Sequence, residues 1–295
     1  MSTGTIPKRA LILLVVLTLV WGTNWPLFSI AVREVSVWTF RTVSALAGGL
    51  ILLGVARLRG ESLRVARADW PVLVGATLLY LVVWNVASTY SATMIPSGQA
   101  AILGFTMPLW SALLSWLLLG EKLAPRMRLA LLLGMGAVAL LLWRGLGAYA
   151  QAPLGFALGL LAAIGWAAGT LLLKRRPPKV SALVLTGWQL VVNSLPIALV
   201  MATQAQGPWF MPSWTSILVI TYITLVPTCI GNLAWFSIVG MLPATVAGLA
   251  SLMVPMVAMV SAALVHGDPL GPVQWAAMAL SATSLALVVF KPART

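Results

Sequence analysis

Ten apolar runs, each about twenty residues long, are separated by short polar connectors along this sequence. A helix of about 20 residues spans the hydrocarbon core of a bilayer, whereas barrel strands would read as alternating segments of about ten residues. Backbone groups cannot bond to water in hydrocarbon, so continuous runs of this length predict spanning helices. The predicted spans cover residues 10–31, 36–56, 70–90, 96–119, 127–146, 153–173, 180–203, 214–238, 243–265 and 272–290.

The composition agrees with a membrane protein. Of the 295 residues, 61% are hydrophobic and 8% charged, whereas an average soluble domain has about 25% charged residues. The net charge of +13 would suggest nucleic acid in a soluble protein, but these basic residues sit on short connectors between apolar runs. We therefore expect the lipid bilayer and a small-molecule substrate as partners, no nucleic acid, no cofactor and no metal, with a monomer as the working expectation.

The distribution of Lys and Arg predicts the orientation, because cytoplasmic loops carry the excess of basic residues. With a cytoplasmic N-terminus, the inside residues are Lys8, Arg9, Arg57, Arg59, Arg64, Arg67, Lys122, Arg126, Arg128, Lys174, Arg175, Arg176, Lys179, Lys291 and Arg294. Only Arg33, Arg41 and Arg144 then lie outside. This bias predicts a multi-pass protein of the bacterial inner membrane with both termini in the cytoplasm.

A shift of 147 residues superposes the first half of the chain on the second. The matched pairs include Pro96 with Pro243, Pro108 with Pro255, Pro125 with Pro272, and Gly120-Glu121 with Gly267-Asp268. Each half, 1–147 and 148–295, therefore holds five spans, and two similar units with an odd number of spans must enter the membrane in opposite senses. The predicted fold is an all-α membrane protein of two inverted five-helix repeats, an architecture in which transporters place a midplane site between the repeats and work by alternating access.

Ionisable groups inside a membrane are costly and usually functional, so their positions restrict the cargo. The acids Glu34, Glu61, Asp69, Glu121 and Asp268 all fall in connectors or at helix ends, and the single His266 lies near an outer end. A proton-coupled cation antiporter would need a central carboxylate, and a nucleotide-sugar carrier would need central basic residues. The pattern favours a neutral or zwitterionic cargo and facilitated export, and it argues against an intramembrane enzyme.

Aromatic and amide side chains occupy the predicted middle of the membrane. Indoles with a few amides can form a pocket for an amphipathic ligand, although the same residues can simply pack helices together. The candidate substrate-binding residues are Trp21, Asn24, Phe28, Arg41, Tyr80, Trp84, Asn85, Trp110, Trp166, Trp188, Gln189 and Asn232. Trp21, Asn24 and Phe28 share one face of the first span, since they stand at i, i+3 and i+7.

Arg41 and three prolines each allow more than one interpretation. Arg41 opens the second span near the outer surface, where it would clamp a substrate carboxylate, pair with Glu34 as a gate, or reach the lipid headgroups as an interfacial residue. Pro26, Pro108 and Pro255 interrupt predicted helices, and proline removes a backbone hydrogen bond. They are candidate hinges for opening and closing, or static bends.

Four sequence motifs resemble the EamA-type members of the drug/metabolite transporter superfamily. They are Trp21-Gly22-Thr23-Asn24, Arg41 at the start of the second span, the fourth span from Pro96 through Pro108, and Gly120-Glu121-Lys122-Leu123. The second half departs from this pattern at His266 and Asp268. Within the superfamily the chain is most similar to the YddG-like aromatic amino-acid exporters, which implies export of neutral or aromatic amino acids. Export of hydrophobic drugs or other metabolites, and a passive channel, remain alternatives.

Overall fold

In the computed structural model, residues 6–95, 97–120, 124–143, 145–204, 212–267 and 270–289 are described. This part of the chain is helical and contains ten helical segments long and apolar enough to cross a membrane, from Lys8–Glu34 to Pro272–Val289. They correspond one to one with the ten predicted spans, so the predicted fold class is confirmed. Pro96, Glu121, Lys122, Leu123, Arg144 and Asp268 lie outside the described residues.

The elements follow one another in the same order in both halves. The first half contains α1 (Lys8–Glu34), α2 (Val37–Leu58), α3 (Trp70–Thr77), η1 (Leu78–Val82), α4 (Val83–Met94), α5 (Ser97–Gly104), α6 (Met107–Leu119) and α7 (Pro125–Trp143). The short α8 (Leu146–Gln151) connects it to the second half, so the expected boundary at 147 falls within this helix. The second half contains α9 (Pro153–Arg175), α10 (Ala182–Gln204), α11 (Trp214–Ile223), η2 (Thr224–Gly231), α12 (Asn232–Met241), α13 (Ala244–Ala250), α14 (Met253–His266) and α15 (Pro272–Val289).

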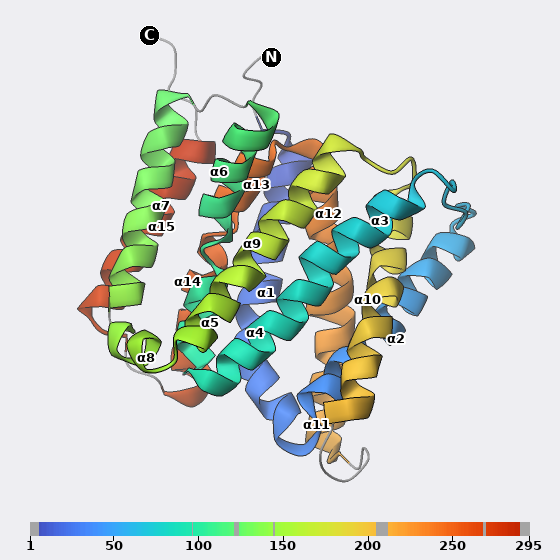
Figure 1. Cartoon of the computed structure of the whole chain (residues 1–295), viewed down its shortest axis with the longest axis horizontal. Coiled ribbons are helices and arrows are strands. Elements are labelled where there is room, and N and C mark those ends of the chain that lie inside the picture. The colour runs from blue at the N-terminus through green and yellow to red at the C-terminus, as the bar shows by residue number, and fades with distance from the viewer. Residues whose placement is uncertain are drawn as a thin grey trace.

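The repeat extends to local backbone geometry. A π-helical segment interrupts the third span of each half, η1 in the first and η2 in the second. Gly120 and Gly267, 147 residues apart, end α6 and α14 with φ of 64° and 73°, a left-handed conformation that glycine adopts without steric cost. In Figure 1 the third span of the first half runs downward from α3 through α4, whereas its counterpart runs upward from α11 to α12, which shows the inversion.

The fourth span of each half is broken rather than kinked. Between α5 and α6 the chain turns at Phe105 and Thr106, and between α13 and α14 it turns at Ser251 and Leu252. Pro108 and Pro255 therefore stand in the first turn of a new helix, where their missing N–H leaves no bond unmade. Pro26 lies inside α1. Any hinge in the fourth spans would lie at these breaks, just before the prolines.

The two halves of the sequence are interwoven. The first span of each half packs in the other half: α1 contacts α14, η2 and α12, and α9 contacts α6, η1 and α4. Two pairs of equivalent helices, α2 with α10 and α7 with α15, complete the bundle. Consequently the two repeats cannot rock as separate bodies, and any movement must involve groups of helices drawn from both.

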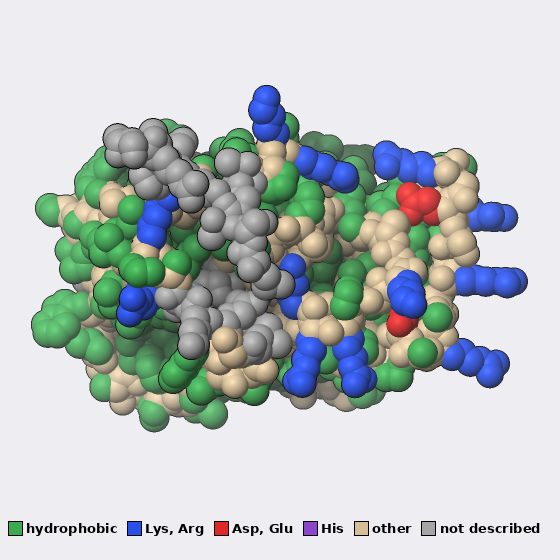
Figure 2. All heavy atoms as spheres, turned by 90° about the horizontal axis from the view of Figure 1, so that it is seen from above, with side chains coloured by type: hydrophobic (Ala, Val, Ile, Leu, Met, Phe, Trp, Pro, Cys, Tyr) green, Lys and Arg blue, Asp and Glu red, His purple; other side chains and the backbone are tan. Residues whose placement is uncertain are grey.

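The two membrane faces of the molecule differ in charge. Figure 2 looks down on the face where α1 begins and α15 ends, and Lys and Arg side chains gather on it. We call it the basic face; its described residues are Lys8, Arg9, Arg57, Arg59, Arg64, Arg67, Arg126, Arg128, Lys174, Arg175, Arg176 and Lys179. The other end, which we call the opposite face, has Arg33 at the last turn of α1.

Candidate functional site

A cavity of about 190 Å³ lies between the repeats, several times the roughly 30 Å³ that one water molecule occupies in the liquid. Trp21, midway along the 27-residue α1, lies at its wall. From there the cavity extends toward the opposite face. The lining residues are Trp21, Asn24, Phe28, Phe40, Arg41, Ser44, Ala45, Leu81, Trp84, Asn85, Ser88, Phe105, Met107, Trp166, Leu190, Asn193, Ile223, Pro227, Thr228, Asn232 and Val254.

Three indoles form one wall of the cavity. The ring of Trp166 lies 5.4 Å from that of Trp21 and 5.0 Å from that of Trp84, both in edge-to-face contact. Trp21 donates its Nε1–H to the carbonyl oxygen of Pro227 at 3.1 Å, a carbonyl in the π-helical segment η2. The Nε1–H of Trp166 is buried without a partner. The wall is therefore largely apolar.

Two glycines make room for this wall. A Cβ on Gly231 would overlap the indole of Trp21, and a Cβ on Gly104 would lie 2.7 Å from the ring of Trp84. Such distances are shorter than atoms tolerate, so a larger residue at either position would displace the indole packed on it.

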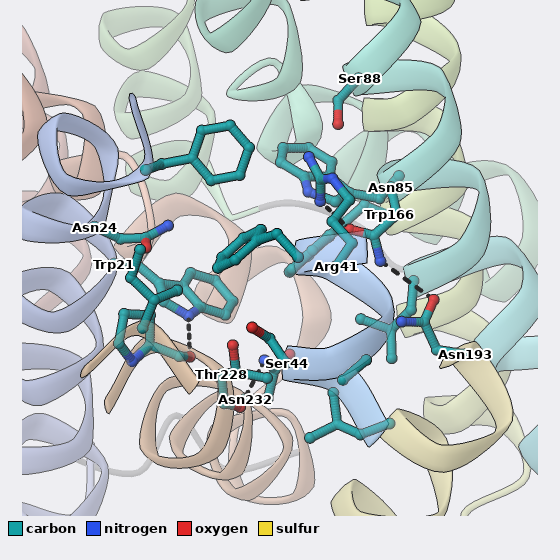
Figure 3. Close-up of a pocket in the computed structure, with 18 of the residues that line it drawn as sticks. Trp21, Asn24, Arg41, Ser44, Asn85, Ser88, Trp166, Asn193, Thr228 and Asn232 are labelled. Carbon is teal, nitrogen blue, oxygen red and sulfur yellow. Dashed lines mark hydrogen bonds between the residues drawn. The ribbon is translucent and has the colours of Figure 1, made fainter. Parts of the chain in front are cut away.

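Four amides line the cavity, and three of them have described partners. Asn85 donates to the side-chain oxygen of Asn193 at 3.2 Å, and Asn232 donates to the carbonyl oxygen of Thr228 at 2.9 Å. Asn85 and Asn232 are 147 residues apart, so the repeat places one amide on each side. The side-chain oxygen of Asn24 is buried without a partner. In Figure 3, Asn24 lies across the cavity from Arg41, Asn85 and Asn193.

Arg41, the fifth residue of α2, lines the cavity and is its only charged group among the described lining residues. Its guanidinium donates to the side-chain oxygen of Asn85 and lies 5.4 Å from the ring centre of Phe28. Its Nε is buried without a partner. Neither an interfacial position nor a pair with Glu34 describes this arrangement, since Glu34 instead accepts the backbone N–H of Ser213 at 2.7 Å. A basic group does therefore face the central cavity, as the interpretation of Arg41 as a substrate-binding residue requires, although the positions of the ionisable residues had predicted no central charge.

Eight of the twelve candidate binding residues line the cavity: Trp21, Asn24, Phe28, Arg41, Trp84, Asn85, Trp166 and Asn232. The other four lie elsewhere. Tyr80 is fully buried, with its ring 4.0 Å from that of Trp166. Trp110 donates to Thr106 at 3.1 Å, and Trp188 donates to the carbonyl oxygen of Leu63 at 2.9 Å. Gln189 is fully buried, and neither atom of its amide has a partner.

Trp188 lies outside the cavity, on the side of the basic face. It stands six residues after the start of α10, about 9 Å along the helix axis, close to the basic face. Its ring packs against Trp70, with centroids 5.3 Å apart.

The cavity contains polar residues that the sequence reasoning missed. Asn193 stands four residues after Gln189, Thr228 four before Asn232, and Ser44 three after Arg41. Residues three or four apart share a helix face. Extending the same helical stripes by one turn would have found all three.

The EamA-like transporter family matches residues 8–143 and 153–290. The uncharacterized transporter YvbV of Bacillus subtilis (strain 168) is 28% identical over 96% of this chain and 92% of its own length. The uncharacterized inner membrane transporter YedA of Escherichia coli (strain K12) is 26% identical, covering 92% of this chain and 88% of its own. A probable amino-acid metabolite efflux pump of Escherichia coli (strain K12) is 27% identical, covering 66% of this chain and 68% of its own.

A solved crystal structure shares the fold, with a TM-score of 0.81 over 96% of this chain and 98% of that one at 21% identity. The two family matches cover one five-span repeat each, in agreement with the repeat seen in the structure. A family of transporters, not of enzymes, thus accounts for both halves, and the chain belongs to the EamA-like transporter family.

Proposed function

We propose that this transporter exports small amphipathic metabolites, chiefly neutral or aromatic amino acids, from the cytoplasm by alternating access. The observation that carries the proposal is the cavity between the repeats, in which Trp21, Trp84 and Trp166 form an apolar wall and amides supply polar groups. An aromatic wall with a few placed polar groups suits a ligand with one apolar and one polar end.

Two further observations support the orientation in the membrane and the cargo. The basic face carries most of the described Lys and Arg residues, so by the positive-inside rule it is the cytoplasmic face and both termini are cytoplasmic. One relative carries the name of a probable amino-acid metabolite efflux pump. The resemblance to YddG-like aromatic amino-acid exporters points to the same cargo.

The proposal is tested by efflux from proteoliposomes loaded with single amino acids. We expect saturable, stereoselective export of phenylalanine or another aromatic or neutral amino acid. Alanine at Trp21, Asn24 or Trp166 should reduce it, whereas Trp275→Ala, at a position 58% exposed outside the cavity, should not. Unchanged transport in all three cavity variants would discard the cavity as the site. Efflux that neither saturates nor distinguishes enantiomers would indicate a passive channel, and selective efflux of hydrophobic drugs alone would replace amino acids as cargo.

The mechanism we propose is facilitated export without proton coupling. No Asp or Glu is among the described residues that line the cavity, and a neutral amide or a guanidinium cannot exchange a proton at physiological pH. A pH gradient imposed on the same proteoliposomes, without an amino-acid gradient, should drive no uphill uptake. Accumulation under a pH gradient alone would overturn this part of the proposal.

A further inference from the structure

Two opposite sides of the cavity differ in hydrogen-bonding character. On one side the guanidinium of Arg41 is a donor with a fixed positive charge, and on the other the side-chain oxygen of Asn24 is an acceptor. Both have an atom buried without a partner, Nε of Arg41 and Oδ1 of Asn24. Figure 3 shows these two side chains on opposite sides of the cavity.

A buried charge without a counter-ion is unfavourable unless something compensates it. Around Arg41 the described compensation is partial: the oxygen of Asn85 accepts one hydrogen bond, and the ring of Phe28 lies 5.4 Å away. Asn85 is itself held by Asn193, so the guanidinium is fixed in direction while most of its five N–H donors are not used by Asn85. Such a group is prepared to receive an anion, and a planar carboxylate fits its fork.

We infer that Arg41 binds the carboxylate of the cargo and Asn24 accepts a hydrogen bond from its amino group, so that the cavity selects zwitterionic α-amino acids. This inference rests on the proposed function, since it names the groups by which that cavity would recognise its cargo. The apolar side chain of the ligand then lies against the wall of Trp21, Trp84 and Trp166. Asn85 and Asn193 act as positioning residues that hold the guanidinium.

The arrangement also explains how a site without Asp or Glu in its described lining can select zwitterions. A cationic amine lacks the group that neutralises Arg41, and it adds a second positive charge to the same cavity. An amino acid brings its own negative charge and leaves no unpaired ion. Amines and amino-acid amides should therefore be rejected although their aromatic groups fit the same wall.

The test compares four ligands that share one aromatic side chain: phenylalanine, phenylalaninamide, phenethylamine and 3-phenylpropionate. Binding to the purified full chain is measured by isothermal titration calorimetry. We expect phenylalanine to bind most tightly. Both compounds without a carboxylate should bind weaker by roughly 10- to 100-fold, the range for losing a hydrogen bond to a charged group. The affinity for 3-phenylpropionate, which lacks only the amino group, should lie between that for phenylalanine and those for the two compounds without a carboxylate.

Variants assign the two ends of the ligand. Arg41→Gln should remove the preference for phenylalanine over its amide, and Arg41→Lys should retain part of it. Asn24→Ala should weaken the binding of phenylalanine but leave the binding of 3-phenylpropionate unchanged. Arg33→Gln is the matched control, because Arg33 is exposed at the end of α1 and does not line the cavity.

The outcomes separate this inference from the proposed function. If phenylalaninamide binds to the wild-type chain as tightly as phenylalanine, the carboxylate site is overturned while amino-acid transport stands, and this comparison needs no variant to fold. If 3-phenylpropionate binds through Arg41 but no amino acid binds or is exported, the cargo is a carboxylate of another class. The proposed function then fails, as does the role of Asn24, and the role of Arg41 stands.

Discussion

Toward the opposite face the space between the repeats holds the cavity, and toward the basic face it is filled by side chains. We call these the open end and the filled end; both are built from equivalent positions. A shift of 147 carries Arg41 to Trp188 and Ser88 to Trp235. Arg41 and Ser88 line the cavity, whereas Trp188 packs against Trp70 and Trp235 is 1% exposed in the core. At both positions a polar residue in the open end corresponds to an indole in the filled end. The asymmetry is thus present in the sequence as well as in the conformation.

Connectors of the two halves are bonded to one another at both faces. At the basic face, residues 61–69 meet the start of α10 and the segment before it. Asp69 accepts the backbone N–H of Lys179 at 3.0 Å, Glu61 accepts from the hydroxyl of Ser181, and Trp188 donates to Leu63. At the opposite face Glu34 accepts the backbone N–H of Ser213 at 2.7 Å and also bonds to the side chains of Ser213 and Ser216. Bonds between connectors of the two halves are therefore described at both faces, and those at the basic face lie beside the filled end.

The largest effect on the difference between the two ends is expected from removing the central indole of the filled end. Trp235→Ala deletes a side chain that contacts the rings of Trp21 and Trp166, and a buried Trp→Ala substitution costs about 3–5 kcal/mol of stability. We expect a large drop in the free energy of unfolding, measured by denaturant titration. Trp275→Ala, at an exposed position, is the control and should change it little. Equal stability of Trp235→Ala and the wild type would mean that this end is not packed as described.

A smaller effect is expected where the open and filled ends meet. Gly231 corresponds to Trp84 in the first half; its lack of a side chain leaves the space that Trp21 occupies. Gly231→Ala should displace that indole, at a cost of about 1–3 kcal/mol for overpacking, and should slow amino-acid efflux. The measurements are thermal unfolding and the proteoliposome assay.

Gly240→Ala is the matched control for this substitution. Gly240 lies in the same span, and a Cβ there would meet no atom within 4 Å. The stability and the transport rate of the Gly240→Ala variant should equal those of the wild type. If the two alanine variants behave alike, Trp21 is not held by the space at Gly231.

Sequence reasoning predicted the spans and their repeat because both depend on patterns along the chain. Apolar runs determine where helices cross, and the shift of 147 showed which helices correspond. The contacts of α1 with α14 and of α9 with α6 could not be predicted, since no local pattern records which distant helix a span meets.

The candidate site could be predicted from the sequence only as far as the depth of each residue in the membrane could be predicted. Trp84 and Trp188 are both indoles in apolar spans, but Trp84 lies in the middle of its span and lines the cavity, whereas Trp188 lies six residues from a helix start. The environment of Arg41 was harder to predict, because the fifth residue of a span can face headgroups, a neighbouring loop or a cavity. Only the positions of Asn85 and Phe28 decide between them.

The smallest expected effect concerns the connectors. Exposed bonds of this kind contribute about 0.2–1 kcal/mol. Losing one therefore changes the equilibrium between the state open at the opposite face and the state open at the basic face by about fivefold at most. Asp69→Ala should favour opening at the basic face, and Glu34→Ala should not. The probes are single cysteines at Ser88, in the open end, and at Gln189, buried in the filled end, in a Cys229→Ala background. In nanodiscs, Asp69→Ala should raise the maleimide labelling rate at position 189 and lower it at position 88. If Glu34→Ala produces the same pair of changes, the bonds at the two faces are not opposed, and the difference between the ends resides in the indoles alone.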